Sequence, residues 1–130
     1  MGMKKEVKNW LDSAQYDLEA AEGMFEIGKY IYTIFMCHLA MEKILKAKIQ
    51  EITGITPPKS HSLRYLLKLS NLEPTESISE FISKLSDVSI VTRYPEDFEE
   101  TRRAYNEEAA GKYLAGAKEA FQWIRQFLKP

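Results

Sequence analysis

The sequence predicts an all-α protein, an antiparallel up-and-down bundle of three long and two shorter helices. Apolar residues recur at steps of three and four along each long segment, which is the period of an amphipathic helix. The chain has only five prolines and six glycines in 130 residues, and most of the prolines stand between these segments. Because no linker-like or repetitive tract appears, we expect residues 1–130 to form a single domain.

The first helix is expected from about Lys5 to Glu26, with Gly28 as its end signal. Acidic residues lie off its apolar stripe, which consists of Val7, Trp10, Leu11, Ala14, Leu18, Ala21 and Phe25. The unbroken stripe favours one long helix over two short ones.

The second helix, expected over residues 29–52, differs between its two halves. Within residues 30–41 only Thr33 and His38 interrupt the apolar residues, so no face is left for water. Beyond Glu42 the pattern becomes amphipathic. A helix that is apolar all round lies either at the centre of a small bundle or beneath a partner subunit.

A short helix over residues 62–72 and a longer one over 75–91 are expected next. Ser77 and Glu80 have the spacing of a capping box, in which each side chain bonds a free amide at the helix start.

Pro95 ends this helix, and residues 96–103 are too polar to bury. The last helix is expected over residues 104–128 and contains two glycines, Gly111 and Gly116. Each costs up to about 1 kcal/mol relative to alanine, which suggests a close approach to another helix.

Composition excludes several classes of protein. Lys and Arg total 18 against 19 Asp and Glu, so the net charge of −1 gives no overall attraction to nucleic acid or to an anionic membrane. The single Cys37 excludes an intramolecular disulfide and any zinc site with two thiolates. No secretory leader or segment long enough to span a bilayer is present, so we expect a cytoplasmic protein without membrane contact, metal or cofactor.

Four motifs, in order along the chain, resemble the HEPN domain family. They are Trp10, Ala14, Asp17-Leu18 and Ala21; the run Ala40-Met41-Glu42-Lys43-Ile44-Leu45-Lys46-Ala47; Pro57-Pro58 with His61-Ser62-Leu63; and Arg93-Tyr94-Pro95 before an Ala-rich helix. The resemblance covers essentially the whole chain. It is to the stand-alone prokaryotic HEPN proteins that are commonly paired with a minimal nucleotidyltransferase.

This resemblance implies a helical bundle that forms a homodimer. Many HEPN proteins are ribonucleases that carry Arg, four to six residues, then His, at a cleft formed in the dimer. The His acts as acid or base while the Arg stabilises charge on the phosphate. Here both histidines, His38 and His61, precede every arginine, so this motif is absent in any register.

We therefore expect a non-catalytic binding and assembly module, a homodimer that partners a minimal nucleotidyltransferase. It would either bind a nucleotide or another substrate, or act as a toxin–antitoxin component. The alternative is an RNA-cleaving toxin with a non-standard site that uses Arg93 and His61. In related toxin–antitoxin pairs the nucleotidyltransferase adenylylates a HEPN tyrosine, and Tyr94 and Tyr105 are the corresponding candidates here.

Arg93 and Tyr94 are the main candidates for ligand binding. Arg93, together with Arg102 or Arg103, would hold the phosphate of a nucleotide or of RNA. In the structural interpretation, Pro95 stiffens a turn and Arg93 pairs with one of the acidic residues at 96–100.

His61 and Lys46 are further candidates, each with a structural alternative. His61 would cap a helix or fix its loop, and Lys46 would belong to a solvated helix face. His38 is expected to be a core or interface histidine with a local hydrogen bond, and Glu42, one turn later, would hold its imidazole charged.

Overall fold

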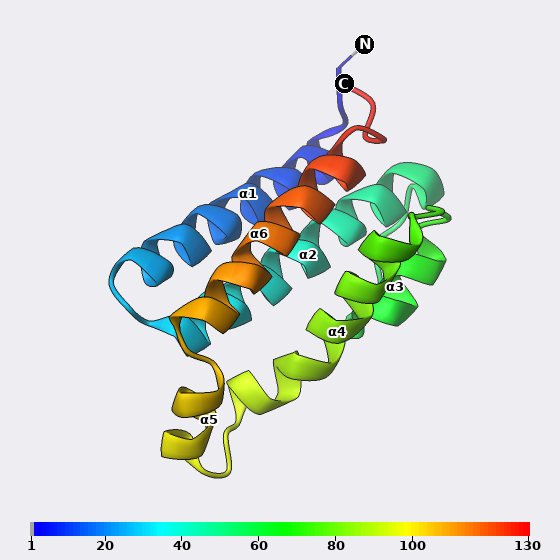
Figure 1. Cartoon of the computed structure of the whole chain (residues 1–130). Helices are drawn as coiled ribbons and strands as arrows, with labels where there is room; N and C mark the ends of the chain where they lie inside the picture. The colour runs from blue at the N-terminus through cyan, green and yellow to red at the C-terminus, as the bar shows by residue number, and fades with distance from the viewer. Residues whose placement is uncertain (1) are drawn as a thin grey trace.

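The computed structural model describes residues 2–130, which form six helices and no strand (Figure 1). In chain order the helices are α1 (Lys5–Glu26), α2 (Tyr30–Thr53), α3 (Leu63–Leu69), α4 (Glu76–Arg93), α5 (Phe98–Ala104) and α6 (Glu107–Arg125). The predicted all-α bundle is confirmed. Within residues 2–130, no helix is both long and apolar enough to cross a membrane.

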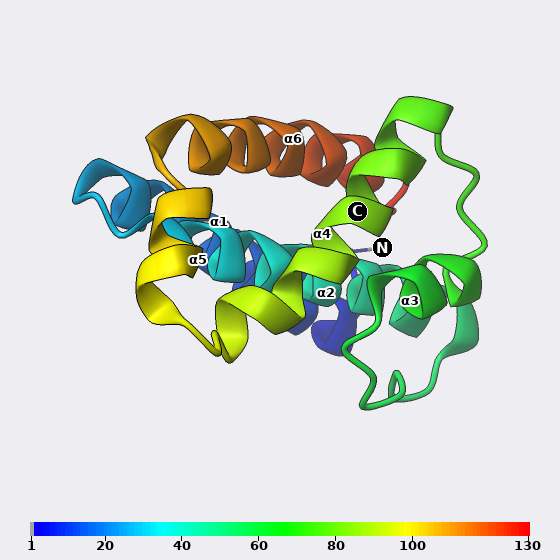
Figure 2. The same cartoon turned by 60° about the horizontal axis from the view of Figure 1, so that its bottom comes forward.

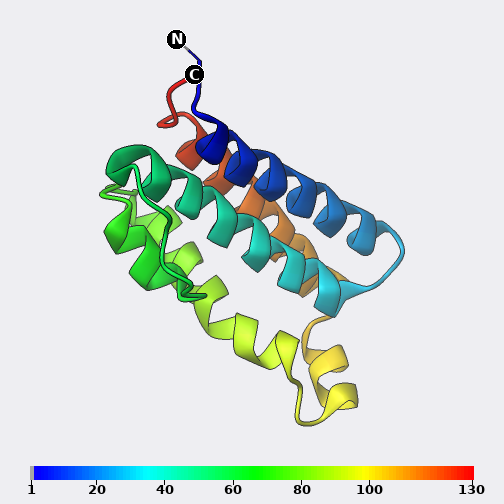
Figure 3. The same cartoon turned by 180° about the vertical axis from the view of Figure 1, so that it is seen from behind.

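Helix α2 is the centre of the bundle. It runs antiparallel to α1, and α1 and α6 pack along one side of it while α3 and α4 pack on the other (Figures 1 and 3). Helix α5 contacts its N-terminal half. Ile34, Cys37, Met41 and Ile44 are completely buried along it. Its apolar first half is therefore explained chiefly by a central position in the monomer.

A glycine with a left-handed backbone conformation stands at the end of each of the first two helices. Gly28, which follows the C-cap residue Ile27 of α1, has a φ of 79°, and this confirms it as the end signal. Gly54 has a φ of 73° and closes α2, its N–H donating to the carbonyl oxygen of Gln50. A left-handed backbone at this position strongly favours glycine.

The predicted cap of α4 was wrong by two residues. Thr75, rather than Ser77 with Glu80, is the N-cap, and its side-chain oxygen accepts a hydrogen bond from Ile78 N at 3.3 Å. This bond satisfies one free amide of the first turn, whereas the predicted capping box would have satisfied two.

Helix α5 lies where the sequence predicted an unburied polar segment (Figure 2). The Asp97 side chain caps it by accepting from Glu100 N at 3.1 Å. Acidic residues in its first turn and Arg102 and Arg103 in its last turn match the helix dipole. Thr101 is its one buried residue. Asn106 then caps α6, so the expected single helix over 104–128 starts later, at Glu107.

Gly116 of α6 is the close helix contact that the sequence suggested. A Cβ atom there would lie 2.3 Å from Cε1 of Phe81 in α4, too close for any side chain. Phe81 also packs against Tyr113, with ring centroids 6.3 Å apart. At Gly111 a Cβ would meet only the Phe25 ring, at an ordinary 3.6 Å.

We expect Gly116→Ala to destabilise the protein by about 1–3 kcal/mol, because the added methyl forces the Phe81 ring out of its place. Gly23→Ala is the matched control, since a Cβ at that helical glycine meets no atom within 4 Å. It should be neutral or stabilising by up to about 1 kcal/mol. Urea unfolding of the three proteins measures both effects, and equal midpoints for the two variants would contradict this packing.

Candidate functional site

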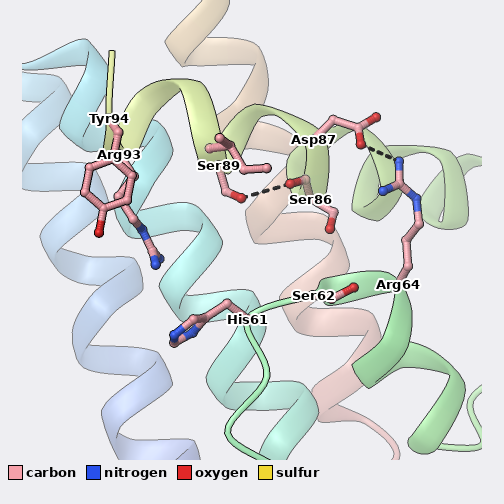
Figure 4. A pocket seen from close by; sticks show the side chains of 9 residues that line it. His61, Ser62, Arg64, Ser86, Asp87, Ser89, Arg93 and Tyr94 are labelled. Carbon is pink, nitrogen blue, oxygen red and sulfur yellow. Dashed lines mark hydrogen bonds and ion pairs between the residues drawn. The ribbon is translucent and has the colours of Figure 1, made fainter. Parts of the chain in front are cut away.

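A cleft of about 470 Å³ opens between α4 and the loop that leads into α3 (Figure 4). We call it the α3–α4 cleft. His61 and Arg64 line it from the loop and α3, and Ile90, Arg93 and Tyr94 line it from α4. Serine side chains complete the lining, contributed by Ser62, Ser86 and Ser89, together with Asp87. The structure therefore brings together three of the predicted residues, namely His61, Arg93 and Tyr94.

His61 is held in place by Glu42 of α2. Its Nδ1 donates to Glu42 Oε1 at 3.0 Å, while its side chain remains 62% exposed. The N-cap of α3 is the neighbouring Ser62, whose hydroxyl oxygen accepts from Tyr65 N. Of the two structural roles expected for His61, fixing the loop is therefore confirmed and capping is wrong.

Lys46 is a buried residue and not part of a solvated face. Its Nζ bonds the other oxygen of Glu42, Oε2, at 3.0 Å, and only 6% of the residue is exposed. The ring of Trp10 in α1 covers the same Nζ at 5.6 Å from the ring centroid. Glu42 itself is 5% exposed. Both carboxylate oxygens thus have a partner, as a buried charge requires.

His38 lies beneath His61 as a fully buried core histidine, which confirms its expected place. Its Nε2 donates to the backbone oxygen of His61 at 3.1 Å, because a carbonyl only accepts. Burial lowers the pKa of His38 from 6.5 to about 4, outweighing the opposing effect of Glu42. The expectation that Glu42 would hold this imidazole charged was therefore wrong.

In the neutral ring, Nδ1 of His38 carries no proton. It has no hydrogen-bond partner and lies 3.9 Å from Glu42 Oε1. His61 is consequently the ring that supplies a proton to this oxygen.

Arg93 has no acidic partner among residues 2–130, so the expected pairing with residues 96–100 was wrong. Its guanidinium lies over the Phe35 ring of α2, 5.0 Å from the centroid. Its Nε is buried without a hydrogen-bond partner. Figure 4 shows the side chain extending from α4 towards His61. No hydrogen bond or ion pair within residues 2–130 involves this guanidinium.

Arg64 is a cleft residue that the sequence interpretation did not select. It is already occupied, because it donates to Ser83 Oγ at 2.8 Å and to Asp87 Oδ1 at 2.7 Å. These bonds join α3 to α4 and hold one wall of the cleft. Its place three residues after His61, on the short helix that follows, was the only signal in the sequence.

Arg102 and Arg103 do not join Arg93. Arg102 lines a second cleft of about 480 Å³ between the start of α2 and α5, together with Tyr32, Phe98 and Tyr105. It is paired there with Glu99 at 3.0 Å. Arg103 lines neither cleft. The predicted grouping of these arginines around one phosphate was therefore wrong.

We expect stability to fall as the pH drops from about 6.5 towards 4, because the unfolded chain then binds a proton at residue 38 that the native state rejects. The lowered pKa makes the free energy of unfolding about 3 kcal/mol larger above pH 6.5 than well below pH 4. His38→Gln keeps an N–H donor for the His61 oxygen but does not titrate. Urea unfolding at several pH values should show a shallower acid loss in this variant, and identical pH dependence would contradict the buried neutral ring.

Comparison with known proteins identifies the fold. The HEPN domain family model matches residues 7–127. Among solved structures, TT1696 from Thermus thermophilus superposes with a TM-score of 0.79 at 24% identity, covering 95% of this chain and 98% of that one. ST0689, an archaeal HEPN homologue, gives a TM-score of 0.74 at the same identity and coverage.

At this level of identity the two structures show the fold alone, and no curated protein matches the chain significantly. The family match, however, extends over nearly the whole sequence. The chain therefore belongs to the HEPN domain family.

Proposed function

We propose that the protein is a non-catalytic binding and assembly module whose α3–α4 cleft takes a phosphate-bearing ligand, a nucleotide or RNA. The observation that carries this proposal is that Arg93 lines the same cleft as His61 and has no acidic partner among residues 2–130. Guanidinium groups bind phosphate through paired, charge-assisted hydrogen bonds. The cleft volume of about 470 Å³ lies within the range of small-molecule sites.

The non-catalytic role is supported by the missing Arg–His pair of HEPN ribonucleases. Both histidines precede every arginine in the chain. His38, moreover, is buried and keeps its ring neutral through a lowered pKa of about 4. Of the two histidines, only His61 lines the cleft.

A homodimer is the proposed assembly, and the outer face of α4 is its proposed interface. Ile90, Val91 and Tyr94 follow one stripe of this face and are 70%, 43% and 75% exposed. Exposed apolar side chains gathered in this way mark protein interfaces. A second copy that covers the stripe would lie beside the cleft, because Ile90 and Tyr94 also line it.

A minimal nucleotidyltransferase is the proposed partner, on the basis of the resemblance to stand-alone HEPN proteins. Tyr94, exposed at the cleft, is better placed for modification than Tyr105, which packs against Tyr113. Co-expression with a neighbouring nucleotidyltransferase and co-purification tests the pairing, and separate elution would count against it.

RNA cleavage is the second candidate function, and one contact favours it. The Glu42 carboxylate orients His61 through Nδ1, which leaves Nε2 free to act as a general base in the same cleft as Arg93. Incubation of total RNA with the wild type, Arg93→Ala and His61→Ala separates the two functions. If the wild type cleaves RNA and either substitution abolishes the cleavage, the protein is a ribonuclease and the non-catalytic proposal is wrong. If the RNA stays intact with the wild type, the non-catalytic proposal is supported.

We expect Arg93→Ala to weaken binding of a fluorescein-labelled single-stranded RNA hexanucleotide by about ten- to hundredfold, because charge-assisted hydrogen bonds to phosphate are lost. Arg102→Ala is the matched control, since that arginine lines the other cleft. Fluorescence anisotropy measures both affinities. An equal loss in the two variants would show non-specific attraction and contradict the proposed site.

We expect Val91→Asp to convert the dimer into a monomer, because a carboxylate at this position would be buried without a partner in the interface. Val91 is exposed in the monomer and does not line the cleft, so the folded subunit and the cleft should both remain intact. Sedimentation velocity at micromolar concentration compares it with the wild type. A monomeric wild type would refute the proposed homodimer.

A further inference from the structure

The second cleft, between the start of α2 and α5, has the features of a separate binding site. We call it the α2–α5 cleft. Its volume of about 480 Å³ lies within the range of small-molecule sites. Helix α5 lies against the N-terminal end of α2, which brings two distant parts of the chain to one place (Figures 1 and 2). No residue lines both this cleft and the α3–α4 cleft.

Four aromatic side chains line the α2–α5 cleft, and they form two groups. Tyr30 and Tyr105 are partly buried, and each packs against another aromatic ring of the bundle. Tyr32 and Phe98 are 55% and 56% exposed, and neither has an aromatic partner within residues 2–130. Aromatic rings pair by stacking or edge-to-face contact. The two exposed rings therefore offer apolar surface to a planar aromatic ligand.

The net charge beside these rings is a single positive one. Lys29 lines the cleft, and no carboxylate pairs with its ammonium group among residues 2–130. Arg102 lines it too, but its guanidinium bonds Glu99 Oε2 at 3.0 Å, so the two charges offset each other. One remaining positive charge matches one carboxylate. It also disfavours the cationic ligands that uncharged aromatic cages bind.

The first turn of α2 adds hydrogen-bond donors at the same place. Lys29 is the N-cap residue and makes no side-chain cap bond, and the turn contains no acidic residue. The first amide groups of a helix have no partner within that helix. Ile31 and Tyr32, which carry two of these amide groups, both line the cleft. The positive end of the helix dipole thus acts in the same direction as the lysine charge.

We propose that the α2–α5 cleft binds a small planar aromatic carboxylic acid. Its ring stacks on Tyr32 and Phe98, while its carboxylate bonds Lys29 and the first turn of α2. Stacking and a charge-assisted hydrogen bond together require both the ring and the charge of such a ligand. The proposal does not rest on the proposed function, because Arg93 and the α3–α4 cleft take no part in it.

The test uses the full chain and 2-naphthoate as the probe, followed by nitrogen-15 NMR of the backbone amides. Naphthalene-2-methanol keeps the ring without the charge, and decahydro-2-naphthoate keeps the charge without the aromatic ring. We expect 2-naphthoate to bind with a Kd on the order of 1 mM and to shift the amide signals of residues 29–32. The alcohol should bind about five- to tenfold more weakly, and the saturated acid about two- to tenfold more weakly.

Three results of this titration would overturn the proposal. Equal affinities for the three compounds would show unspecific apolar adsorption. Amide shifts centred on the α3–α4 cleft would place the ligand at the other site. Absence of any shift at concentrations well above the expected Kd would show that the α2–α5 cleft binds no aromatic acid. None of these results bears on the RNA affinity of Arg93, so the proposed function stands or falls separately.

Two substitutions with matched controls separate the ring from the charge. Tyr32→Leu should weaken 2-naphthoate by about two- to tenfold and leave the saturated acid unaffected. Tyr65→Leu removes a similarly exposed ring that lines neither cleft and should change nothing. Lys29→Met should weaken 2-naphthoate by about five- to tenfold and leave the alcohol unaffected, whereas Arg103→Met should bind as the wild type does. Wild-type affinity in Tyr32→Leu or in Lys29→Met would contradict the proposed site.

Discussion

The buried carboxylate of Glu42 is the constraint on which the candidate site depends. It bonds Lys46 within α2 and His61 in the loop before α3, at 3.0 Å each. Burying these charges costs several kcal/mol unless every polar atom is satisfied. The loop is therefore fixed where His61 completes the network, and a second bond from His38 to the His61 backbone locks the same residue. The position of one wall of the cleft follows from this network.

Helix α2 also supports the opposite wall. The guanidinium of Arg93, a residue of α4, packs over the Phe35 ring of α2. Arg64 then links α3 to α4 through Ser83 and Asp87. The central helix thus combines two tasks, because its buried apolar residues form the core while Phe35 and Glu42 contact two side chains that line the cleft. A HEPN fold without the family's Arg–His motif therefore has a cation and an imidazole lining one cleft.

The sequence was sufficient for the long helices but not for the charged contacts. The stripes of α1, α4 and α6 are long enough for their period to be unambiguous, whereas α5 has seven residues and one buried side chain, too few to show any period. In the sequence Lys46 has the pattern of a solvated lysine, because the Trp10 ring that covers its Nζ is distant along the chain. Arg93 was expected to pair with nearby acidic residues, yet its partner is Phe35 in another helix. Local patterns do not report such tertiary contacts.

The central claim is that Arg93 holds a ligand phosphate in the α3–α4 cleft, which His61 also lines in the orientation set by Glu42. A crystal structure with adenosine 3′-monophosphate tests it most directly, because it shows which cleft holds the phosphate. We expect the phosphate on the Arg93 guanidinium, with His61 Nδ1 still bonded to Glu42. A nucleotide bound instead in the second cleft, between Tyr32 and Arg102, or a His61 ring turned away from Glu42, would contradict the account.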